Sequence, residues 1–313
     1  MDIVLLFPGQ GSQKPGMGKD LAESFPEARA AFERADSVLG VHLSRLCFEG
    51  PAEELTLTHN AQPALLAHGA AVWAVARERI APRVRAAAGH SLGEFTAYHA
   101  AGSLSADDAL RVVRRRGELM FESGVRRPGA MAAILGDLTR PIEEVCDRAT
   151  REAGLVVPAN YNAPGQIVIS GEVTGVERAM AIAKEAGAKR VMHLNVSGAF
   201  HSPLMESAAV GLRAALAEAT VTDPTFPVYA NVDGAPVTSG GAARDRLMRQ
   251  LTSPVRWTEE VEALARDFPN ALFVEMGPGT VLVGLVRKIA PSVKTASCGT
   301  VAEVEQLLGL VAS

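Results

Sequence analysis

A G-x-S-x-G pattern at residues 89–93, Gly89-His90-Ser91-Leu92-Gly93, leaves this part of the chain little choice of local structure. The apolar run Val84 to Ala88 precedes it and the helical pattern Leu92 to Ala101 follows it, which predicts a strand, a sharp turn and a helix. Glycines on both sides of the serine carry no Cβ, so strand and helix can approach closely while the hydroxyl is presented at the helix N-terminus. Ser91 is therefore our candidate nucleophile, and a purely structural turn is the alternative.

Short apolar runs that end in turn residues recur along the chain and predict an α/β sheet covered by helices. Four of them read as central strands: Ile3 to Phe7, Val84 to Ala88, Val228 to Asn231 and Ala271 to Met276. With 313 residues, of which 48% are hydrophobic, the chain can bury a large core.

Residues 129 to 196 follow a different order of elements. Strands are expected at Gly129–Gly136, Val156–Asn160, Gln166–Ser170 and Arg190–Val196, and a helix at Thr139–Ala153. The turn residues Asn162 to Gly165 join the middle strands, and a second helix is expected to start at Thr174 with a capping box to Glu177. This βαββαβ order is that of a ferredoxin-like subdomain, so we expect an insert and a ligand cleft between it and the main body.

A serine nucleophile needs a base, and His201 is the histidine best placed to provide one. It follows the loop Ser197 to Phe200 and precedes Ser202-Pro203, an N-cap and first-turn proline that start a helix over Leu204–Ala219. His90 is adjacent to the serine, but neighbouring side chains on a sharp turn diverge, so we expect it to pack nearby. For the remaining histidines a surface or hydrogen-bonded core position is expected: His42, His59, His68, His99 and His193.

Arg116 lies on the apolar face of its own helix. Ser105 caps this helix, with a capping box to Asp108, and at 100° per residue Arg116 shares a face with Ala109, Val112, Val113 and Met120. An inward guanidinium cannot lose its proton and must find an anion. Two partners remain open: an internal Asp or Glu, or a carboxylate on the substrate, held in a two-pronged fork.

The glycine-rich segment Gly9-Gln10-Gly11-Ser12-Gln13 follows the first strand but does not fit a nucleotide site. The third glycine of G-x-G-x-x-G would fall on Lys14, and Gly18-Lys19 has neither the upstream glycine nor the hydroxyl residue of a P-loop. A turn that offers backbone N–H groups to a developing oxyanion suits the serine chemistry better.

The overall composition argues against several classes of protein. A formal net charge of −4 does not suit general binding of nucleic acid or of an anionic membrane surface. No basic leader, cleavage site or long apolar stretch is visible, so we expect a cytoplasmic protein. The three cysteines, widely spaced and without clustered histidines, predict neither disulfides nor a metal site: Cys47, Cys146 and Cys298.

Seven motifs, in order along essentially the whole chain, resemble those of the malonyl-CoA:acyl carrier protein transacylases. They are FPGQGSQ (Phe7–Gln13), QPAL (from Gln62), GHSLGE (Gly89–Glu94), RRGELM (Arg115–Met120), NAPGQIVISG (from Asn162), GAFHSPLM (Gly198–Met205) and EMGPG (Glu275–Gly279). The resemblance implies an α/β-hydrolase-like body with a parallel sheet, residues 1–126 and 197–313, and a ferredoxin-like subdomain, residues 127–196.

The resemblance also implies roles for individual residues. Ser91 would be the nucleophile, His201 the general base and acid, and Arg116 the anchor of the malonyl carboxylate. The main-chain N–H groups of Gln10 and Leu92 would form the oxyanion hole, and the main-chain carbonyl of Gln250 would orient His201, with Asp233 as the rival. Phe200, whose ring leaves little room for a 2-methyl branch, and Met120 would set specificity.

The expected activity is transfer of malonyl from coenzyme A to the phosphopantetheine thiol of an acyl carrier protein, through a serine ester and without metal or cofactor. Three alternatives stay open: a free-standing malonyl transferase of a polyketide pathway, a serine thioesterase or hydrolase, and an inactive docking module. An inward Arg116 argues against a hydrolase of neutral acyl groups. Arg126 and Arg127 could meet an acidic carrier or the phosphates of coenzyme A, although a solvated charge run explains them as well.

Overall fold

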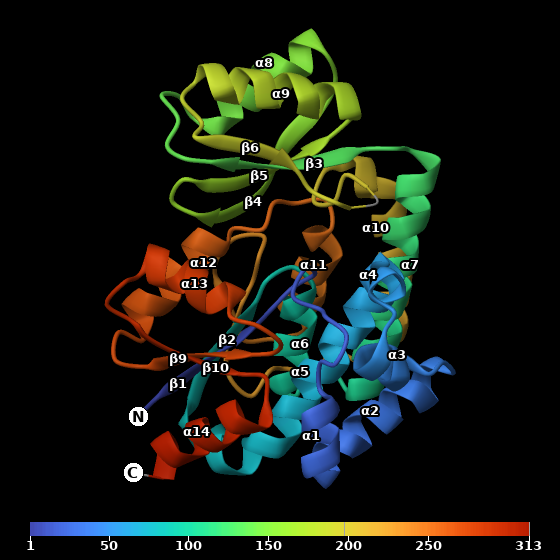
Figure 1. Cartoon of the computed structure of the whole chain (residues 1–313), viewed down its shortest axis with the longest axis vertical. Helices are drawn as coiled ribbons and strands as arrows, with labels where there is room; N and C mark the ends of the chain where they lie inside the picture. Colours follow the sequence, from blue (N-terminus) through green and yellow to red (C-terminus); the bar gives the residue numbers. More distant parts are fainter. Residues whose placement is uncertain (197, 313) are drawn as a thin grey trace.

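A six-stranded, mainly parallel sheet forms the centre of the larger part of the molecule (Figure 1). In this computed structural model, which describes residues 1–196 and 198–312, the strand order is β10-β9-β1-β2-β7-β8, and β8 pairs antiparallel with β7. The strands are β1 (Ile3–Phe7), β2 (Val84–Gly89), β7 (Val228–Tyr229), β8 (Pro236–Val237), β9 (Leu272–Met276) and β10 (Lys294–Cys298). Each of the four apolar runs predicted as central strands therefore contains a strand of this sheet, although β7 ends at Tyr229 rather than at Asn231.

Helices cover both faces of the large sheet, which explains why its central strand is apolar throughout. Side chains of β1 alternate: Ile3, Leu5 and Phe7 enter one core cluster, and Val4 and Leu6 the other. The first cluster includes residues of α5 (Thr58–Ile80) and α6 (Leu92–Ala100), and the second those of α12 (Trp257–Asp267) and α13 (Val281–Ile289). A strand buried on both faces has no solvent side on which to place polar residues.

The remaining helices of the body surround this core. They are α1 (Lys19–Ser24), α2 (Pro26–Leu39), α3 (Leu43–Glu49), α4 (Ala52–Thr56), α7 (Ala106–Arg126), α10 (Glu206–Glu218), α11 (Gly240–Gln250) and α14 (Val301–Ala312), with 3-10 turns η1 (Ala81–Arg83) and η2 (Pro203–Met205). No helix within residues 1–196 and 198–312 is long and apolar enough to cross a membrane. The three cysteines are buried and unpaired.

A smaller subdomain lies at the top of Figure 1 and has the predicted βαββαβ order. Its elements are β3 (Ala130–Leu135), α8 (Ile142–Glu152), β4 (Val156–Ala163), β5 (Gln166–Gly171), α9 (Val173–Glu185) and β6 (Arg190–His193). The sheet order is β4-β5-β3-β6 with antiparallel pairs, and α8 and α9 pack on its outer face. This arrangement is ferredoxin-like, so the predicted fold class is confirmed.

Two strand boundaries in the subdomain were predicted wrongly. Asn162 and Ala163 belong to β4, which continues to Ala163, so the turn between β4 and β5 is only Pro164-Gly165. The last strand, β6, ends at His193 rather than Val196. In β4 the longer pairing contains register shifts near Pro158 and Tyr161, which mask the period-2 pattern on which the prediction relied.

The predicted capping box at Thr174 is also wrong. Helix α9 begins at Val173, its N-cap is Glu172, and no side chain caps it. The Thr174 hydroxyl instead donates to Ala153 O (2.9 Å), and Glu172 accepts from Leu155 N (3.1 Å) and forms an ion pair with Arg127. These tertiary contacts outcompete the local cap.

Main-chain hydrogen bonds join the subdomain to the body along β4. Tyr161 N donates to Val255 O (2.9 Å), and Val255 N donates to Ala159 O (2.8 Å). The Thr258 hydroxyl of α12 donates to Tyr161 O (3.0 Å). We retain the division at residues 126/127 and 196/197 as a proposal; Ser197, with which the second part of the body would start, lies outside the described residues.

Candidate active site

Ser91 lies on the strained turn between β2 and α6. Its φ of 52° and ψ of −107° place a non-glycine residue in the left-handed half of backbone space, which costs free energy. The flanking glycines make this turn possible: a Cβ on Gly93 would lie 2.0 Å from Phe7 O, and one on Gly89 would lie 2.0 Å from the backbone of Gly93. The spacing of the G-x-S-x-G pattern thus follows from the close approach of β1, β2 and α6.

The structure brings His201 to Ser91 across 110 residues of sequence. His201 Nε2 lies 2.8 Å from Ser91 Oγ, and His201 is the second non-glycine residue with a positive φ (56°) among those described. Ser202 holds this loop: its hydroxyl donates to Ala199 O (2.6 Å) and accepts from Leu204 N (3.3 Å). The cap is as predicted, but the first turn is the 3-10 helix η2, and α10 starts only at Glu206.

Two backbone carbonyls orient His201. Its Nδ1 lies 3.1 Å from Gln250 O and 3.2 Å from Ser253 O. Because carbonyl oxygens only accept hydrogen bonds, Nδ1 carries the proton and Nε2 is free to accept from the serine hydroxyl. Asp233, the rival candidate for orienting the histidine, instead forms an ion pair with Arg246 (3.1 Å).

The pH dependence of acylation should reflect this environment. Burial, and next the charge of Arg116, lower the pKa of His201 to about 3, so the imidazole stays neutral as the pH falls through 6.5. We expect the rate of acetyl-enzyme formation from acetyl-CoA to be constant between about pH 5.5 and 7.5. A base with the usual histidine pKa would instead lose about tenfold in rate per pH unit below about 6.5, and such a loss in a stopped-flow acylation assay would contradict this assignment.

His90 does not contact the serine hydroxyl. Its Nε2 lies 2.7 Å from Asn162 Oδ1 of the subdomain, and its ring packs against Trp257 at a centroid distance of 5.7 Å. His90 therefore packs beside the turn, as the sequence suggested. Of the other histidines, His68 is fully buried, and burial lowers its pKa to about 4.

Arg116 points into the core from α7 and is 1% exposed. It donates to Gln62 Oε1 (2.7 Å), Gln250 Oε1 (2.9 Å) and Ser91 Oγ (3.1 Å), and it lies over the ring of Phe95 (5.4 Å). Every hydrogen-bond acceptor is uncharged, so the described residues do not provide the internal carboxylate partner that was the first alternative. Burial lowers the pKa of Arg116 to about 10, and the nearby charge of Glu94 raises it.

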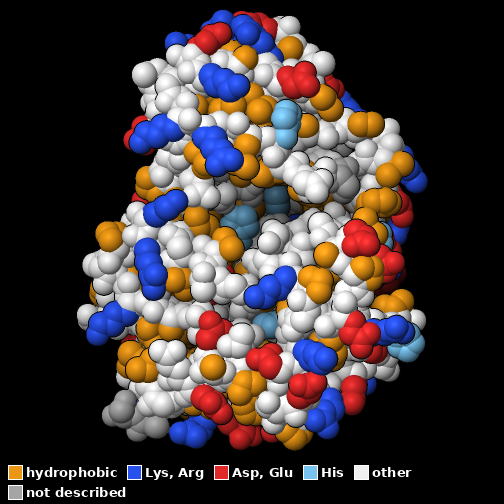
Figure 2. Space-filling view, viewed as in Figure 1, with side chains coloured by type: hydrophobic (Ala, Val, Ile, Leu, Met, Phe, Trp, Pro, Cys, Tyr) orange, Lys and Arg blue, Asp and Glu red, His pale blue; other side chains and the backbone are white. Residues whose placement is uncertain are grey.

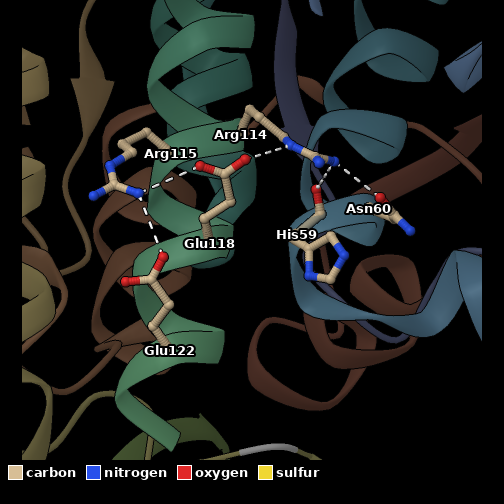
Figure 3. Close-up of polar contacts among 6 residues, drawn as sticks. All are labelled: His59, Asn60, Arg114, Arg115, Glu118 and Glu122. Carbon is tan, nitrogen blue, oxygen red and sulfur yellow. Dashed lines mark hydrogen bonds and ion pairs between the residues drawn. The ribbon is translucent and has the colours of Figure 1, made fainter. Parts of the chain in front are cut away.

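The opposite face of α7 is polar. Figure 3 shows Glu118 between Arg114 and Arg115, with Arg115 also reaching Glu122. All four side chains are partly exposed. The salt bridges on this face are of the kind that contributes little stability individually.

Arg114 has a second role, at the start of α5. Its Nη1 donates to His59 O (2.9 Å) and to Asn60 Oδ1 (2.9 Å), as Figure 3 shows. His59 O needs this donor because Pro63, four residues on and inside α5, has no N–H to give it. Gly117 lets the helices approach, since a Cβ there would lie 2.7 Å from His59 Cα. This crossing holds Gln62 where it meets Arg116.

A cavity of about 120 Å³ opens onto Ser91 between the body and the subdomain. Figure 2 shows the hollow, with histidine side chains on its floor. Its polar lining includes Gln10, Gln62, Arg116 and His201, and its apolar lining is Leu92, Met120, Met131, Leu194, Val196 and Phe200. The sequence-predicted residues Gln10, Leu92, Met120 and Phe200 therefore all border the same cavity as the serine.

The main-chain N–H of Ser91 is not available to an oxyanion, because Asn231 Oδ1 accepts from it at 2.8 Å. Leu92, the next residue, is the first of α6, and the first amides of a helix have no acceptor within the helix. This geometry is compatible with the expected oxyanion-hole role of Leu92. Gln10 borders the cavity from the loop after β1, and its side chain donates weakly to Thr58 Oγ1 (3.4 Å).

Comparison with known proteins places this site in a family. The chain matches the model of the acyl transferase domain over residues 4–308. It is 49% identical to the malonyl CoA-acyl carrier protein transacylase of Bacillus subtilis (strain 168) over 94% of this chain and 92% of the relative. It is 45% identical to that of Escherichia coli (strain K12), with 92% of each chain covered. The chain belongs to the malonyl-CoA–acyl carrier protein transacylase family.

Solved structures of the family have the same fold. The acyl-carrier-protein S-malonyltransferase of Bartonella henselae superposes with a TM-score of 0.95 at 42% identity, covering 100% of both chains. A malonyl-transacylase solved in complex with its type II polyketide synthase acyl carrier protein superposes with a TM-score of 0.93 at 41% identity, covering 99% of this chain and 100% of that one. The family resemblance inferred from the seven motifs is therefore confirmed.

Sequence reasoning missed several residues that support the site. Asn231 Nδ2 donates to Gly89 O (2.8 Å) and Glu260 Oε1 (3.0 Å), in addition to the bond from Ser91 N. Its signal was available, since polar residues just after a buried strand often reach the site of an α/β sheet. Ser253 O gave no signal, because a carbonyl contact depends on backbone path and not on residue type.

Proposed function

We propose that this chain transfers malonyl from malonyl-CoA to the phosphopantetheine thiol of an acyl carrier protein, for fatty acid synthesis, through an ester on Ser91. The supporting observation is the place of Ser91 Oγ, 2.8 Å from His201 Nε2 and 3.1 Å from Arg116 Nη2. A nucleophile, its base and a carboxylate-binding cation thus meet at one atom. We also propose that the protein is cytoplasmic, as expected from the sequence.

In the first half of the cycle His201 Nε2 takes the proton of the Ser91 hydroxyl as the oxygen attacks the malonyl thioester carbon. The N–H groups of Gln10 and Leu92 stabilise the negative oxygen of the tetrahedral intermediate. The carbon–sulfur bond then breaks, His201 returns the proton to the departing coenzyme A thiol, and the malonyl ester remains on Ser91.

In the second half the thiol of the carrier protein replaces coenzyme A. His201 removes the thiol proton, the sulfur attacks the ester carbon, and the carbon–oxygen bond to Ser91 breaks. The proton then passes from His201 to the Ser91 oxygen, which restores the free enzyme. Two sequential displacements with one covalent intermediate predict ping-pong kinetics and require no metal or redox cofactor.

Three residues would select the malonyl group. Arg116, whose partners in the free protein are all neutral, would bind the malonyl carboxylate in place of one or more of them. Phe200 and Met120 are buried side chains on the cavity wall and would limit the volume next to the acyl carbon. Gln250, through its main-chain carbonyl, would keep the His201 tautomer that accepts the serine proton.

Two other functions share parts of this site. A free-standing malonyl transferase of a polyketide pathway would use the same chemistry, and one of the similar solved structures is described as binding a type II polyketide carrier. A thioesterase would share Ser91 and His201, but a buried guanidinium has no use in hydrolysis of a neutral acyl chain. The proposal therefore rests on Arg116 for its reaction class.

The test is a two-step mass measurement. Incubation with malonyl-CoA should add one malonyl group to the protein, and addition of holo acyl carrier protein should remove it and give malonyl-carrier. Release of free malonate at the same rate without carrier would favour the hydrolase. Comparing carriers from fatty acid and polyketide systems by kcat/KM would distinguish the two pathways.

A further inference from the structure

Behind the candidate site lies a buried carboxyl group that the proposed mechanism does not use. Glu94 is in the first turn of α6, three residues after Ser91, and is 0% exposed. Its Oε2 accepts from Gln250 Nε2 (2.7 Å) and from Asn231 N (3.2 Å), and its Oε1 has no partner among the described residues. A buried carboxyl with a free oxygen is costly, so it needs an explanation.

Glu94 fixes which way the side-chain amide of Gln250 faces. Gln250 Nε2 donates to Glu94 Oε2 and to Ser91 O (2.9 Å). The carbonyl oxygen of Ser91 can only accept a hydrogen bond, and so can the carboxylate of Glu94 when it is ionised. The amide oxygen is therefore turned toward Arg116, from which it accepts at 2.9 Å. A flipped amide would place its oxygen against two acceptors and its NH₂ group against the guanidinium.

The same arrangement keeps the negative charge one side chain away from Arg116. Among the described residues, the guanidinium donates only to the neutral acceptors Gln62, Gln250 and Ser91. A carboxylate in direct contact would compete with the substrate for the guanidinium, whereas one behind Gln250 stabilises the buried cation and leaves its face open.

We propose that Glu94 is a positioning residue for malonyl selection: it orients Gln250 toward Arg116 and sets how strongly Arg116 attracts the malonyl carboxylate. This inference rests on the proposed function, in which Arg116 anchors the malonyl group. Glu94 touches no reacting atom, and it acts through Gln250 and through its charge.

The proposal predicts a pH dependence of malonyl binding. Burial raises the pKa of Glu94 to about 7, opposed by the hydrogen bonds from Gln250 and Asn231. The charged and titratable groups around it are Asp233 after β7, Arg116 of α7, Tyr98 of α6 and Glu260 of α12. As the pH rises through 7 the ionised Glu94 partly offsets the charge of Arg116, so KM for malonyl-CoA should rise while that for acetyl-CoA stays constant.

Two variants separate the charge of Glu94 from its hydrogen bonds. Glu94→Gln can keep both bonds through its amide oxygen and removes the charge; KM for malonyl-CoA at pH 8.5 should fall about threefold or more and become independent of pH. Glu94→Ala removes both, so Gln250 can turn; the malonyl-to-acetyl ratio of kcat/KM should fall about tenfold.

Glu260→Gln is the matched control. Glu260 is equally buried and also bonded to Asn231, but it does not contact Gln250, so its replacement should leave the malonyl-to-acetyl ratio as in wild type. Melting temperatures of all variants identify losses of activity that are due to impaired folding. If Glu94→Ala does not fold, the test of the proposal is the pH dependence of KM in Glu94→Gln.

Equal losses on both substrates in the Glu94 variants, or a wild-type pH dependence of KM in Glu94→Gln, would overturn the proposal. The proposal would also be overturned if Glu260→Gln changed the malonyl-to-acetyl ratio of kcat/KM as much as the Glu94 variants do, because the effect would then be general to the buried cluster. Failure of the proposed function gives a different result, in which the wild-type protein shows no preference for malonyl-CoA over acetyl-CoA.

Discussion

Ser91→Ala is expected to abolish the malonyl adduct of the protein and to lower kcat/KM for malonyl transfer by about 10⁴-fold or more. The reason is that both half-reactions of the proposed cycle pass through an ester on this oxygen, and the described residues around the cavity place no other hydroxyl against His201 Nε2. The measurement is the intact mass after incubation with malonyl-CoA, followed by peptide mapping of the modified residue.

The control for this experiment is Ser12→Ala, which removes the hydroxyl of the loop that also carries Gln10. It should leave the adduct at its wild-type level. A malonyl group that persists on another side chain of the Ser91→Ala variant would refute the mechanism, whereas noncovalent retention of malonyl-CoA alone would not produce a mapped peptide.

Arg116→Ala is expected to lower kcat/KM for malonyl-CoA by about 10²- to 10³-fold or more, because an unpaired buried anion costs about 3 to 5 kcal/mol. Reaction with acetyl-CoA should be retained or should improve. The acetyl group has no carboxylate, so it loses no binding partner when Arg116 is removed. The substitution also frees the Ser91 oxygen from the hydrogen bond that it accepts from Arg116 (3.1 Å). The measurement is kcat/KM for both thioesters, with the melting temperature.

Arg115→Ala serves as the neighbouring control, because Arg115 is on the exposed side of α7 and, within the described part of the chain, pairs only with Glu118 and Glu122. This substitution should leave kcat/KM unchanged for both malonyl-CoA and acetyl-CoA. If Arg116→Ala depresses malonyl and acetyl transfer equally and lowers the melting temperature, Arg116 has a structural role and the anchor hypothesis is wrong.

The fold could be predicted to the extent that burial leaves a periodic pattern in the sequence. The apolar run of β1 was visible because both faces of this strand are buried, and the βαββαβ order of the subdomain was visible because its helices and strands turn apolar side chains toward one core. The extension of β4 to Ala163 and the start of α9 at Val173 were not, since register shifts and contacts from Thr174 and Glu172 override local preference.

The candidate site divides in the same way. The turn at Ser91 and the inward phase of Arg116 are local properties, and both could be read from spacing. The contacts of Glu94, Asn231 and Ser253 depend on where α6, β7 and the loop after α11 meet, which spacing does not reveal. Glu94 did carry a local signal, since a charged residue on the core side of a short helix is unusual.

The hydrogen bonds between β4 and residues 255–258 bear on how such an enzyme can choose its ligand. Moving β4 away from the body would break the main-chain bonds of Tyr161 and Val255, together with the contact between His90 and Asn162. A binding site whose walls do not move gains no selectivity from closing around the correct substrate, in contrast to induced fit. In a cavity that keeps these bonds, discrimination comes from groups that are already in place when the thioester arrives. The two thiol carriers of the proposed cycle, a small molecule and a protein, then use the same site in turn.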